Sequence, residues 1–471
     1  MEHFDAIVVG AGPAGSTTAY RVARAGARVL LLDKARFPRE KPCGGGVTVR
    51  ALRELPFDVQ PIVEHTVRHV ELRFRGHRGV RRGGDRMLAH MTQRCRLDHF
   101  LVEQAAAVGA VFRDGVKVSE ISEQGVRVDG RWVSAELLIG ADGVNGASAR
   151  ALGFTGRNVY AVALEGNLSY RDVAGRERWQ SMLTLELGTI LGGYGWIFPK
   201  GDHLNIGVGG WESEGPRLRE HFRTFCRRYG FDGTKVEGLR GYRLVARRPG
   251  SAFAGASTLL VGDAAGLVDP LFGDGMSAAF LSARLAAQTA LDFLAGRIAS
   301  LEPYAHAVIA ELGPMTGFGW DAKLALDRLP RTVSIGVFSP PGWGVIEKML
   351  RGEMPEPGVQ KGLPGLAIRG IDVLAWLAGG PGKPYRLEAR ASRVKATELT
   401  ASPNEYEHIV DRNLDHAATR QGPAVLRFTS CRSYEGGVSR LPREPGRFNS
   451  LVSAESRLSR FRRQLGSRTK A

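Results

Sequence analysis

The first 33 residues change from an apolar run to a helical repeat and back again. Residues 5–10, DAIVVG, carry a continuous apolar run, which is typical of a strand buried on both faces. Residues 16–26, STTAYRVARAG, have helical spacing and end on Gly26, a common helix C-cap residue. Residues 27–33, ARVLLLD, predict a second buried strand. The pattern therefore predicts a strand, a turn, a helix and a strand.

The rest of the chain divides into blocks of different periodicity. Residues 97–108 predict an amphipathic helix, and residues 110–143 alternate in a way that predicts a β-meander returning to a buried strand. Residues 156–250 are mostly strand-like, with one helical patch. Residues 257–296 predict a strand, a glycine-rich loop and a long helix, and residues 300–380 predict helices broken by Pro and Gly.

A glycine-rich turn joins the first strand to the first helix. Gly10, Gly12 and Gly15 have GxGxxG spacing. One glycine makes the tight turn, one lets backbone N–H groups reach a pyrophosphate, and one lets the helix pack on the strand. Asp33 closes the second strand 18 residues after Gly15, where a carboxylate accepts hydrogen bonds from ribose hydroxyls. The turn therefore predicts a dinucleotide site.

A second glycine-rich stretch decides between NAD and FAD. Residues 259–280, LLVGDAAGLVDPLFGDGMSAAF, again follow an apolar strand and precede a helix. Asp263 lies just past the strand, where its carboxylate can accept from a polyol chain. Gly273 and Gly275 let the next helix N-terminus face a ring carbonyl and the pyrophosphate. Two such turns on one extended ligand predict a long cofactor, FAD.

Residues 41–46, KPCGGG, place a thiol beside three glycines. A glycine triplet costs backbone entropy, so this stretch predicts a backbone lying close against a flat ligand. Cys43 is either a small buried hydrophobe or a polar contact or proton relay at the reacting edge of a flavin. Arg39 and Lys41 are either solvated charges or help to hold an anion, the pyrophosphate or a substrate diphosphate.

At this point the chain resembles the geranylgeranyl reductase family of FAD-dependent enzymes, within the para-hydroxybenzoate hydroxylase-like flavoprotein superfamily. The resemblance covers residues 4–330 and rests on VVGAGPAGSTTAY, LLDKARFPREKPCGGGV, RCRLDHFL, GADG, YGWIFPKGDHLNIGVG and GDAAGLVDPLFGDGMSAA. The fifth stretch fits a family pattern of aromatic, x, Trp, x, Phe-Pro, seven residues and Gly-x-Gly. Two features depart from the family: VNGASAR follows GADG, which displaces a serine, and Met276 stands where Ile or Val is usual.

The resemblance implies a set of site residues. The cofactor set is Gly10, Gly12, Ala14, Gly15, Asp33, Lys34, Cys43, Gly44, Gly46, Arg94, Val118, Asp263, Gly275 and Met276. The substrate set is Tyr194, Trp196, Phe198, Pro199, Gly207 and Gly209, and the catalytic candidates are Cys43, Trp196 and Tyr194. The aromatic stretch is either a core strand or a wall of a tunnel in which flat apolar faces line an isoprenoid chain.

The expected fold is α/β, with a discontinuous Rossmann-like FAD-binding domain over residues 1–65, 92–155 and 255–300. An inserted antiparallel β-sheet substrate domain is expected over residues 66–91 and 156–254. A mainly helical region is expected over residues 301–385. Residues 386–471 are rich in Arg, Ser and Pro without sustained periodicity, and this composition predicts a basic, poorly ordered tail.

The implied activity is reduction of isoprenoid C=C bonds by hydride transfer from N5 of reduced FAD, with NAD(P)H or another donor as reductant and with a proton added to the neighbouring carbon. Implied substrates are geranylgeranyl diphosphate, a geranylgeranylated pigment, a quinone side chain or an archaeal-type lipid. One alternative is a flavin monooxygenase or halogenase acting on an aromatic, although a halogenase favours WxWxIP where this chain has YGWIFP. The other is a non-catalytic flavin electron carrier.

Composition adds expectations about partners and location. The net charge of +17 indicates either arginine-rich surfaces or a polyanionic partner such as anionic lipid, a diphosphate or nucleic acid. The tail contains no recognised nucleic-acid-binding module, so nucleic acid is not expected. An oily substrate implies peripheral membrane contact, with residues 371–380, IDVLAWLAGG, as the candidate apolar patch.

The cysteines Cys43, Cys95, Cys226 and Cys431 show no CxxC spacing, so neither a metal site nor a disulfide framework is expected. This usage fits a reducing compartment. The start of the chain lacks a basic region before an apolar stretch, and no run of 18 apolar residues occurs. The expected location is the cytoplasm, with peripheral contact at the inner face of the membrane.

Overall fold

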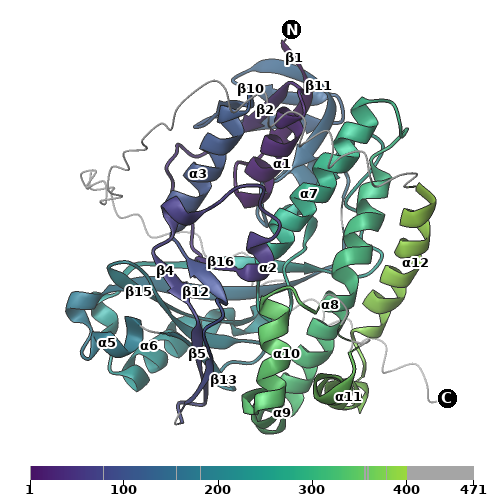
Figure 1. The fold of residues 1–471 in the computed structure, drawn as a ribbon. Coiled ribbons are helices and arrows are strands. Elements are labelled where there is room, and N and C mark those ends of the chain that lie inside the picture. The colour runs from purple at the N-terminus through teal and green to yellow at the C-terminus, as the bar shows by residue number, and fades with distance from the viewer. Residues whose placement is uncertain are drawn as a thin grey trace, which may run out of the picture. The chain divides into compact units, whose positions relative to one another are not determined.

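The computed structural model describes residues 2–399, apart from positions 78, 155, 181, 355–356, 358–359 and 378 (Figure 1). Its first sheet has the order β8-β2-β1-β11-β10-β9, with β17 beside β11. The strands are β1 (Glu2–Val9), β2 (Val29–Leu32), β8 (Val111–Arg113), β9 (Val118–Ser122), β10 (Gly125–Val128), β11 (Arg131–Gly140) and β17 (Thr258–Leu260). Strand β1 pairs in parallel with β2 and β11, whereas β9, β10 and β11 form an antiparallel meander. The predicted buried strands and meander are confirmed.

Helices cover this sheet and bring its loops together. They are α1 (Pro13–Arg24), α2 (Val49–Leu52), α3 (Arg94–Ala107), α4 (Ser148–Ala151) and α7 (Gly275–Leu294). Helix α1 packs against both α3 and α7, and Figure 1 shows the three running side by side. Helix α1 begins three residues earlier than the sequence pattern predicts, because Pro13 at its first turn has a φ suited to a helix start.

A second seven-stranded sheet has the order β16-β12-β15-β14-β13-β5-β6. Its strands are β5 (His69–Phe74), β6 (Val80–Gly83), β12 (Asn158–Ser169), β13 (Leu183–Leu187), β14 (Tyr194–Pro199), β15 (His203–Trp211) and β16 (Glu237–Arg247). The expectation of a wholly antiparallel sheet is wrong, because β13 pairs in parallel with β5. Strand β5 comes from a much earlier segment, so no hairpin forces the two strands to be antiparallel.

Short elements complete the space between and around the two sheets. A three-stranded sheet contains β3 (Gly46–Thr48), β4 (His65–Val67) and β7 (Ala89–Met91). Helices α5 (Arg176–Gln180) and α6 (Leu218–Tyr229) accompany the second sheet, and Phe222 and Phe225 of α6 pack on Ile206 in its core. The 3₁₀ turns are η1 (Gln60–Ile62), η2 (Tyr170–Asp172), η3 (Glu212–Arg217), η4 (Gly233–Lys235) and η5 (Gly262–Ala265).

The C-terminal part of the described chain is helical. It contains α8 (Glu302–Arg328), α9 (Pro330–Phe338), α10 (Pro340–Leu350), α11 (Gly362–Leu377) and α12 (Lys383–Leu399). The prediction of a poorly ordered tail from residue 386 is wrong as far as Leu399, because α12 packs along α8: a Cβ on Gly313 would lie 2.7 Å from that of Ala389. Residues 400–471 lie outside the described residues. None of the helices described is both long and apolar enough to cross a membrane.

Candidate functional site

In the turn before α1, two of the three glycines pack directly against other protein atoms, whereas the third has free space beside it. A Cβ on Gly10 would lie 2.3 Å from the Ala141 carbonyl oxygen, and one on Gly15 would lie 1.8 Å from the Gly10 oxygen. At Gly12, an added Cβ would meet only guanidinium nitrogens, of Arg39 at 3.7 Å and Arg94 at 3.9 Å. The backbone N–H groups at the start of α1 therefore face a cationic space, as anion binding at a helix N-terminus requires.

Three cations surround this open side of the turn. Arg94 donates to both carboxylate oxygens of Asp98 at 2.7 Å, and Arg39 lies 2.9 Å from the same buried carboxylate. The charge of Arg94, together with burial, lowers the pKa of Lys41. Arg39 also lies 3.8 Å from an oxygen of Asp33. Three cationic side chains grouped beside a helix N-terminus form a donor set that fits a diphosphate. Of the two alternatives for Arg39 and Lys41, this geometry favours anion binding over solvated charge.

The acidic residues expected at the two ends of the ligand lie on either side of the turn. Asp33 accepts hydrogen bonds from the Ala11 and Ala35 N–H groups, both at 2.9 Å. Each carboxylate oxygen has a second lone pair, so Asp33 can still accept from hydroxyl groups. Asp263, in η5, has an oxygen 3.1 Å from the position of a Cβ on Gly275. Lys34, beside Asp33, is exposed.

The two glycine turns converge, as the sequence predicts. A Cβ on Gly262 would lie 2.9 Å from the Ala14 Cβ, so η5 packs against the first turn of α1. Asp274 caps α7 by accepting from the N–H groups of Met276 at 3.0 Å and Ser277 at 3.1 Å. The cradle of cations, acidic residues and close backbone fits an extended dinucleotide such as FAD.

The Cys43–Gly46 loop lies between the first turn and the second sheet. Gly45 has φ +68°, and a Cβ there would lie 2.0 Å from the Thr92 carbonyl oxygen. A Cβ on Gly44 would lie 2.7 Å from the Phe198 ring, whereas one on Gly46 would meet only the Met91 thioether at 3.7 Å or more. Contacts with protein therefore explain Gly44 and Gly45, in addition to the flat ligand that the sequence predicts.

Cys43 lies close to several of the expected site residues. Its Sγ accepts from the Gly45 N–H at 3.3 Å, and its side chain packs against the core cluster that contains Met276. Burial alone would lower the pKa of the Arg94 guanidinium, but Asp98 and Cys43 raise it above its ordinary value. Helix α3 begins at Arg94 rather than at residue 97, which places that guanidinium next to both the turn and the thiol.

The aromatic stretch forms a β-hairpin of β14 and β15, in which aromatic rings of β14 pack over glycines of β15. Tyr194 pairs with Gly209 across the strands, and Trp196 pairs with Gly207. A Cβ on Gly207 would lie 2.2 Å from the Trp196 indole, so this ring rests on a position that only glycine leaves free. Pro199 ends the strand, buried.

The polar ends of these rings are also fixed. Trp196 Nε1 donates to Asn205 Oδ1 at 2.8 Å. The Tyr194 hydroxyl donates to the carbonyl of Phe272, in the loop before α7, and burial raises its pKa. Phe198 contacts Gly44, so this hairpin lies directly against the Cys43–Gly46 loop.

Val118 is half-buried at the start of β9, and the Val116 N–H two residues before it donates to the Asp33 carbonyl at 3.0 Å.

Sequence reasoning missed Lys200, which fastens the loop to the hairpin. Its buried Nζ donates to the carbonyl oxygens of Gly44 at 2.5 Å and Thr92 at 2.8 Å. Burial lowers the pKa of Lys200 to about 8. The quoted stretch YGWIFPKGDHLNIGVG contains Lys200, and a lysine at a strand end next to a Pro was its signal.

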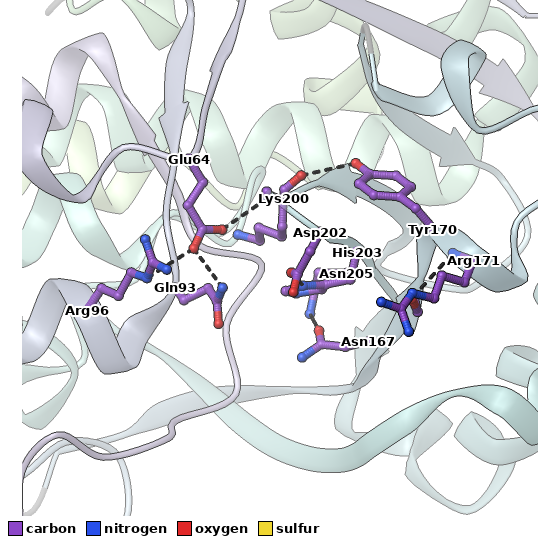
Figure 2. Close-up of polar contacts among 12 residues, drawn as sticks. Glu64, Gln93, Arg96, Asn167, Tyr170, Arg171, Lys200, Asp202, His203 and Asn205 are labelled. Carbon is purple, nitrogen blue, oxygen red and sulfur yellow. Dashed lines mark hydrogen bonds and ion pairs between the residues drawn. The ribbon is translucent and has the colours of Figure 1, made fainter. Parts of the chain in front are cut away.

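The neighbours of Lys200 hold the hairpin turn in place (Figure 2). Its carbonyl accepts from the Tyr170 hydroxyl at 3.1 Å, and the Gly201 N–H donates to Glu64 at 3.3 Å. Glu64 also accepts from Gln93, the residue before α3, at 2.6 Å. These bonds connect the turn to the start of the helix that carries Arg94.

Sequence reasoning also missed Glu165, a carboxylic acid on β12. Its Oε1 accepts from the Cys43 N–H, and burial raises its pKa to about 7. A single acid inside the apolar run AVALEGNL was the signal available in the sequence. The site therefore holds a thiol, a carboxyl and an ammonium group beside an aromatic wall.

Comparisons with known proteins show that this chain is similar to FAD-binding reductases. A family model described as an FAD binding domain matches residues 3–174. Menaquinone reductase of Mycobacterium tuberculosis is 37% identical over 314 residues, which cover 60% of this chain and 76% of the relative. Digeranylgeranylglycerophospholipid reductase 1 of Methanopyrus kandleri is 31% identical over 323 residues, which cover 61% of this chain and 80% of the relative.

A solved structure shares the fold. It is a geranylgeranyl bacteriochlorophyll reductase-like protein from Thermoplasma acidophilum, with a TM-score of 0.64 at 21% identity, and the match covers 85% of this chain and 100% of that chain. The chain belongs to the geranylgeranyl reductase family of FAD-dependent oxidoreductases.

Proposed function

We propose that this protein reduces C=C bonds of isoprenoid chains with FAD as its cofactor. The observation that carries the proposal is the contact between the Cys43–Gly46 loop and the aromatic hairpin. Phe198 packs on Gly44, and the buried Trp196 lies beside it. A flat apolar surface beside the flavin-binding loop suits a hydrocarbon chain, which offers no polar groups along its length.

The residues of this chain have distinct roles in the proposal. Arg39, Lys41 and Arg94 hold the pyrophosphate at the start of α1, and Asp33 binds the ribose. The aromatic hairpin orients the prenyl chain and excludes water. When bound, FAD supplies the hydride, and NAD(P)H or another donor supplies the reducing equivalents.

The relatives indicate which isoprenoids to test first. One is named for menaquinone and another for a digeranylgeranylglycerophospholipid, and in both names the prenyl chain belongs to a lipid. We therefore propose a prenyl chain on a quinone or lipid head as the substrate class, with free geranylgeranyl diphosphate as the second candidate.

An anaerobic half-reaction tests the proposal. The FAD-loaded protein is reduced with dithionite and mixed in turn with menaquinone, a digeranylgeranyl lipid and geranylgeranyl diphosphate. We expect flavin reoxidation and a product heavier by two hydrogens for each bond reduced. Absence of reoxidation with every prenyl compound would contradict the proposal. An oxygen-dependent hydroxylated or halogenated product would favour the monooxygenase or halogenase alternative, and flavin reduction without any product would favour an electron carrier.

The role of Cys43 gives a first prediction. If its thiol contacts the reacting edge of the flavin, Cys43→Ala should slow prenyl-driven reoxidation about tenfold or more. Stopped-flow absorbance and mass spectrometry of the product measure the rate and the number of bonds reduced. Cys226→Ala is the matched control, because Cys226 is a buried cysteine on α6, in the core of the second sheet. An unchanged rate and product pattern in Cys43→Ala would assign the thiol to packing.

The peripheral membrane contact gives a second prediction. Helix α11 exposes Leu366 (60%), Val373 (56%), Trp376 (75%) and Leu377 (69%) on one face, together with Arg369. Exposed apolar residues with Trp and Arg are typical of helices that lie in a membrane interface. We propose that this face binds an anionic bilayer.

The double variant Trp376→Ala/Leu377→Ala should weaken co-sedimentation with phosphatidylglycerol vesicles about tenfold or more, because two large apolar side chains leave the lipid. Its activity on a short, water-soluble prenyl substrate should not change. Val394→Ala is the control, because Val394 is equally exposed but lies on α12. Equal vesicle binding by both variants would rule out the α11 face.

A further inference from the structure

Glu165 is a buried acid, and one of its oxygens lacks a well-formed hydrogen bond among the described residues. Its exposed fraction is 5%. Its Oε1 accepts from the Cys43 N–H, but Oε2 has no hydrogen-bond partner among the described residues. An ionised carboxylate buried with an unpaired oxygen is costly, whereas a neutral carboxyl costs much less. The position therefore favours a protonated acid beside the Cys43–Gly46 loop.

The cations near Glu165 are engaged elsewhere. Lys200 donates to the carbonyls of Gly44 and Thr92, and Arg94 donates to Asp98. No ion pair joins Glu165 to either cation in the part of the chain that the structure describes. Both remain close enough for their charges to lower its pKa, yet burial outweighs them and raises it.

The other elements packed against Glu165 present few charges. Asn205 on β15 is neutral, and hydrogen bonding from it lowers the pKa of Glu165, although its Nδ2 also donates to Asn167 at 3.0 Å. Tyr242 on β16 has its pKa raised by burial and by Glu165. Arg240, the register partner of Glu165 on β16, is exposed. Cys43, whose N–H donates to Glu165, is a further titratable neighbour.

We infer that Glu165 is the proton donor of the alkene reduction, an inference that rests on the proposed function. One alkene carbon receives a hydride at the expense of the reduced flavin, and the π bond breaks. The neighbouring carbon takes the proton from the Glu165 O–H bond, so that the substrate gains two electrons and two hydrogens. Glu165 is left as a carboxylate near the Lys200 ammonium, and a proton from solvent restores it before the next turnover.

Two substitutions separate proton donation from support of the loop. Glu165→Gln keeps an oxygen that accepts from the Cys43 N–H but has no acidic proton, whereas Glu165→Ala loses both. We expect Glu165→Gln to bind FAD and to be reduced like the wild type, but to undergo prenyl-driven reoxidation about 100-fold more slowly. The wild-type rate should fall as pH rises through about 7, and the residual rate of Glu165→Gln should not.

Glu186→Gln is the matched control. Glu186 is also buried in the second sheet, on β13, but it accepts from the Tyr229 hydroxyl at 2.6 Å and pairs with Arg228. We expect this variant to keep the wild-type dependence of rate on pH. Wild-type reoxidation rates in Glu165→Gln would overturn the inference while leaving the proposed function standing.

A measurement without substrate tests the protonation of Glu165 separately. The pKa of Glu165 is about 7 in the folded protein and has the ordinary value of 4.5 when the side chain is exposed. Between pH 4.5 and pH 7, the folded state therefore binds more protons than the unfolded state. Glu165 therefore contributes its full stabilisation below pH 4.5, and this contribution is lost as the pH rises through about 7. We expect the Tm of the FAD-loaded wild type, minus that of Glu165→Gln, to fall between pH 5 and pH 8.

The pH dependence of the Tm difference and the rate of flavin reoxidation together distinguish failure of the inference from failure of the proposed function. A Tm difference that stays flat or rises with pH would mean that Glu165 is ionised when folded, and would overturn the inference whatever the substrate. A falling difference without reduction of any prenyl compound would confirm a neutral acid at the site, but would remove its role as donor together with the proposed function.

Discussion

Replacing Gly12 by alanine is expected to weaken FAD binding about 100-fold without unfolding the protein. Gly12 has φ −79° and ψ −175°, an extended conformation that any residue adopts. The added methyl group would meet no protein atom closer than 3.7 Å. It would, however, occupy the surface through which the first N–H groups of α1 reach the pyrophosphate. Hydrogen bonds to a charged group contribute about 1.5–3 kcal/mol each, so losing two corresponds to about 100-fold or more.

Gly15→Ala is the matched comparison, because its methyl group would lie 1.8 Å from the Gly10 oxygen and 2.9 Å from the Ala141 Cβ. Both atoms are held by the packing of α1 on the first sheet. This variant should therefore lose thermal stability even without cofactor. Flavin fluorescence titration measures FAD affinity, and circular dichroism melts of the apoprotein measure stability. Wild-type affinity in Gly12→Ala would place the pyrophosphate away from this turn.

The glycine turns were predictable because their chemistry is local. The GxGxxG spacing, the following helix and Asp33 lie within 33 residues, and Gly10 has φ +109° as a tight turn requires. The convergence of the second turn on the first was also predictable, since both follow central strands of one sheet. These features predict the cofactor end of the site from sequence alone.

The partners across the site were not predictable, because they depend on contacts between distant residues. Cys43 meets Glu165 across 122 positions, and Lys200 meets Gly44 across 156. Alternation places Trp196 and Phe198 on one face of a strand, but it does not say that this face packs on a glycine loop. Two of the three glycines next to Cys43 therefore have a protein partner that sequence reasoning did not supply.

The remaining errors have the same physical origin. The parallel pairing of β13 with β5 joins two segments that no local turn connects. The sequence pattern predicts a tail from residue 386 onward, which includes most of α12. The buried positions of this helix carry small or polar side chains, such as Ala389 and Ser392, which give little apolar periodicity. Its order comes from packing on α8 and from the ion pair between Glu388 and Arg247 at 2.9 Å.

Lys200→Met is expected to have the second large effect, on both stability and cofactor binding. Methionine has a similar length but no donors, so the carbonyls of Gly44 and Thr92 would each lose a charge-assisted hydrogen bond. An unsatisfied buried group costs about 1–3 kcal/mol, and two should lower the free energy of unfolding by about 2–6 kcal/mol. The Cys43–Gly46 loop would also lose its fastening to the hairpin, so FAD affinity should fall about tenfold or more.

Lys323→Met separates these two effects. Lys323 is also buried, and burial likewise lowers its pKa to about 8, but it lies over the Trp211 ring rather than against the glycine loop. Its loss should change stability and leave FAD affinity intact. Chemical denaturation and flavin titration of the two variants give both quantities under one set of conditions. If both variants lose FAD affinity in proportion to their stability, Lys200 supports only the core; if Lys200→Met alone loses it, the lysine holds the loop in the conformation that binds the flavin.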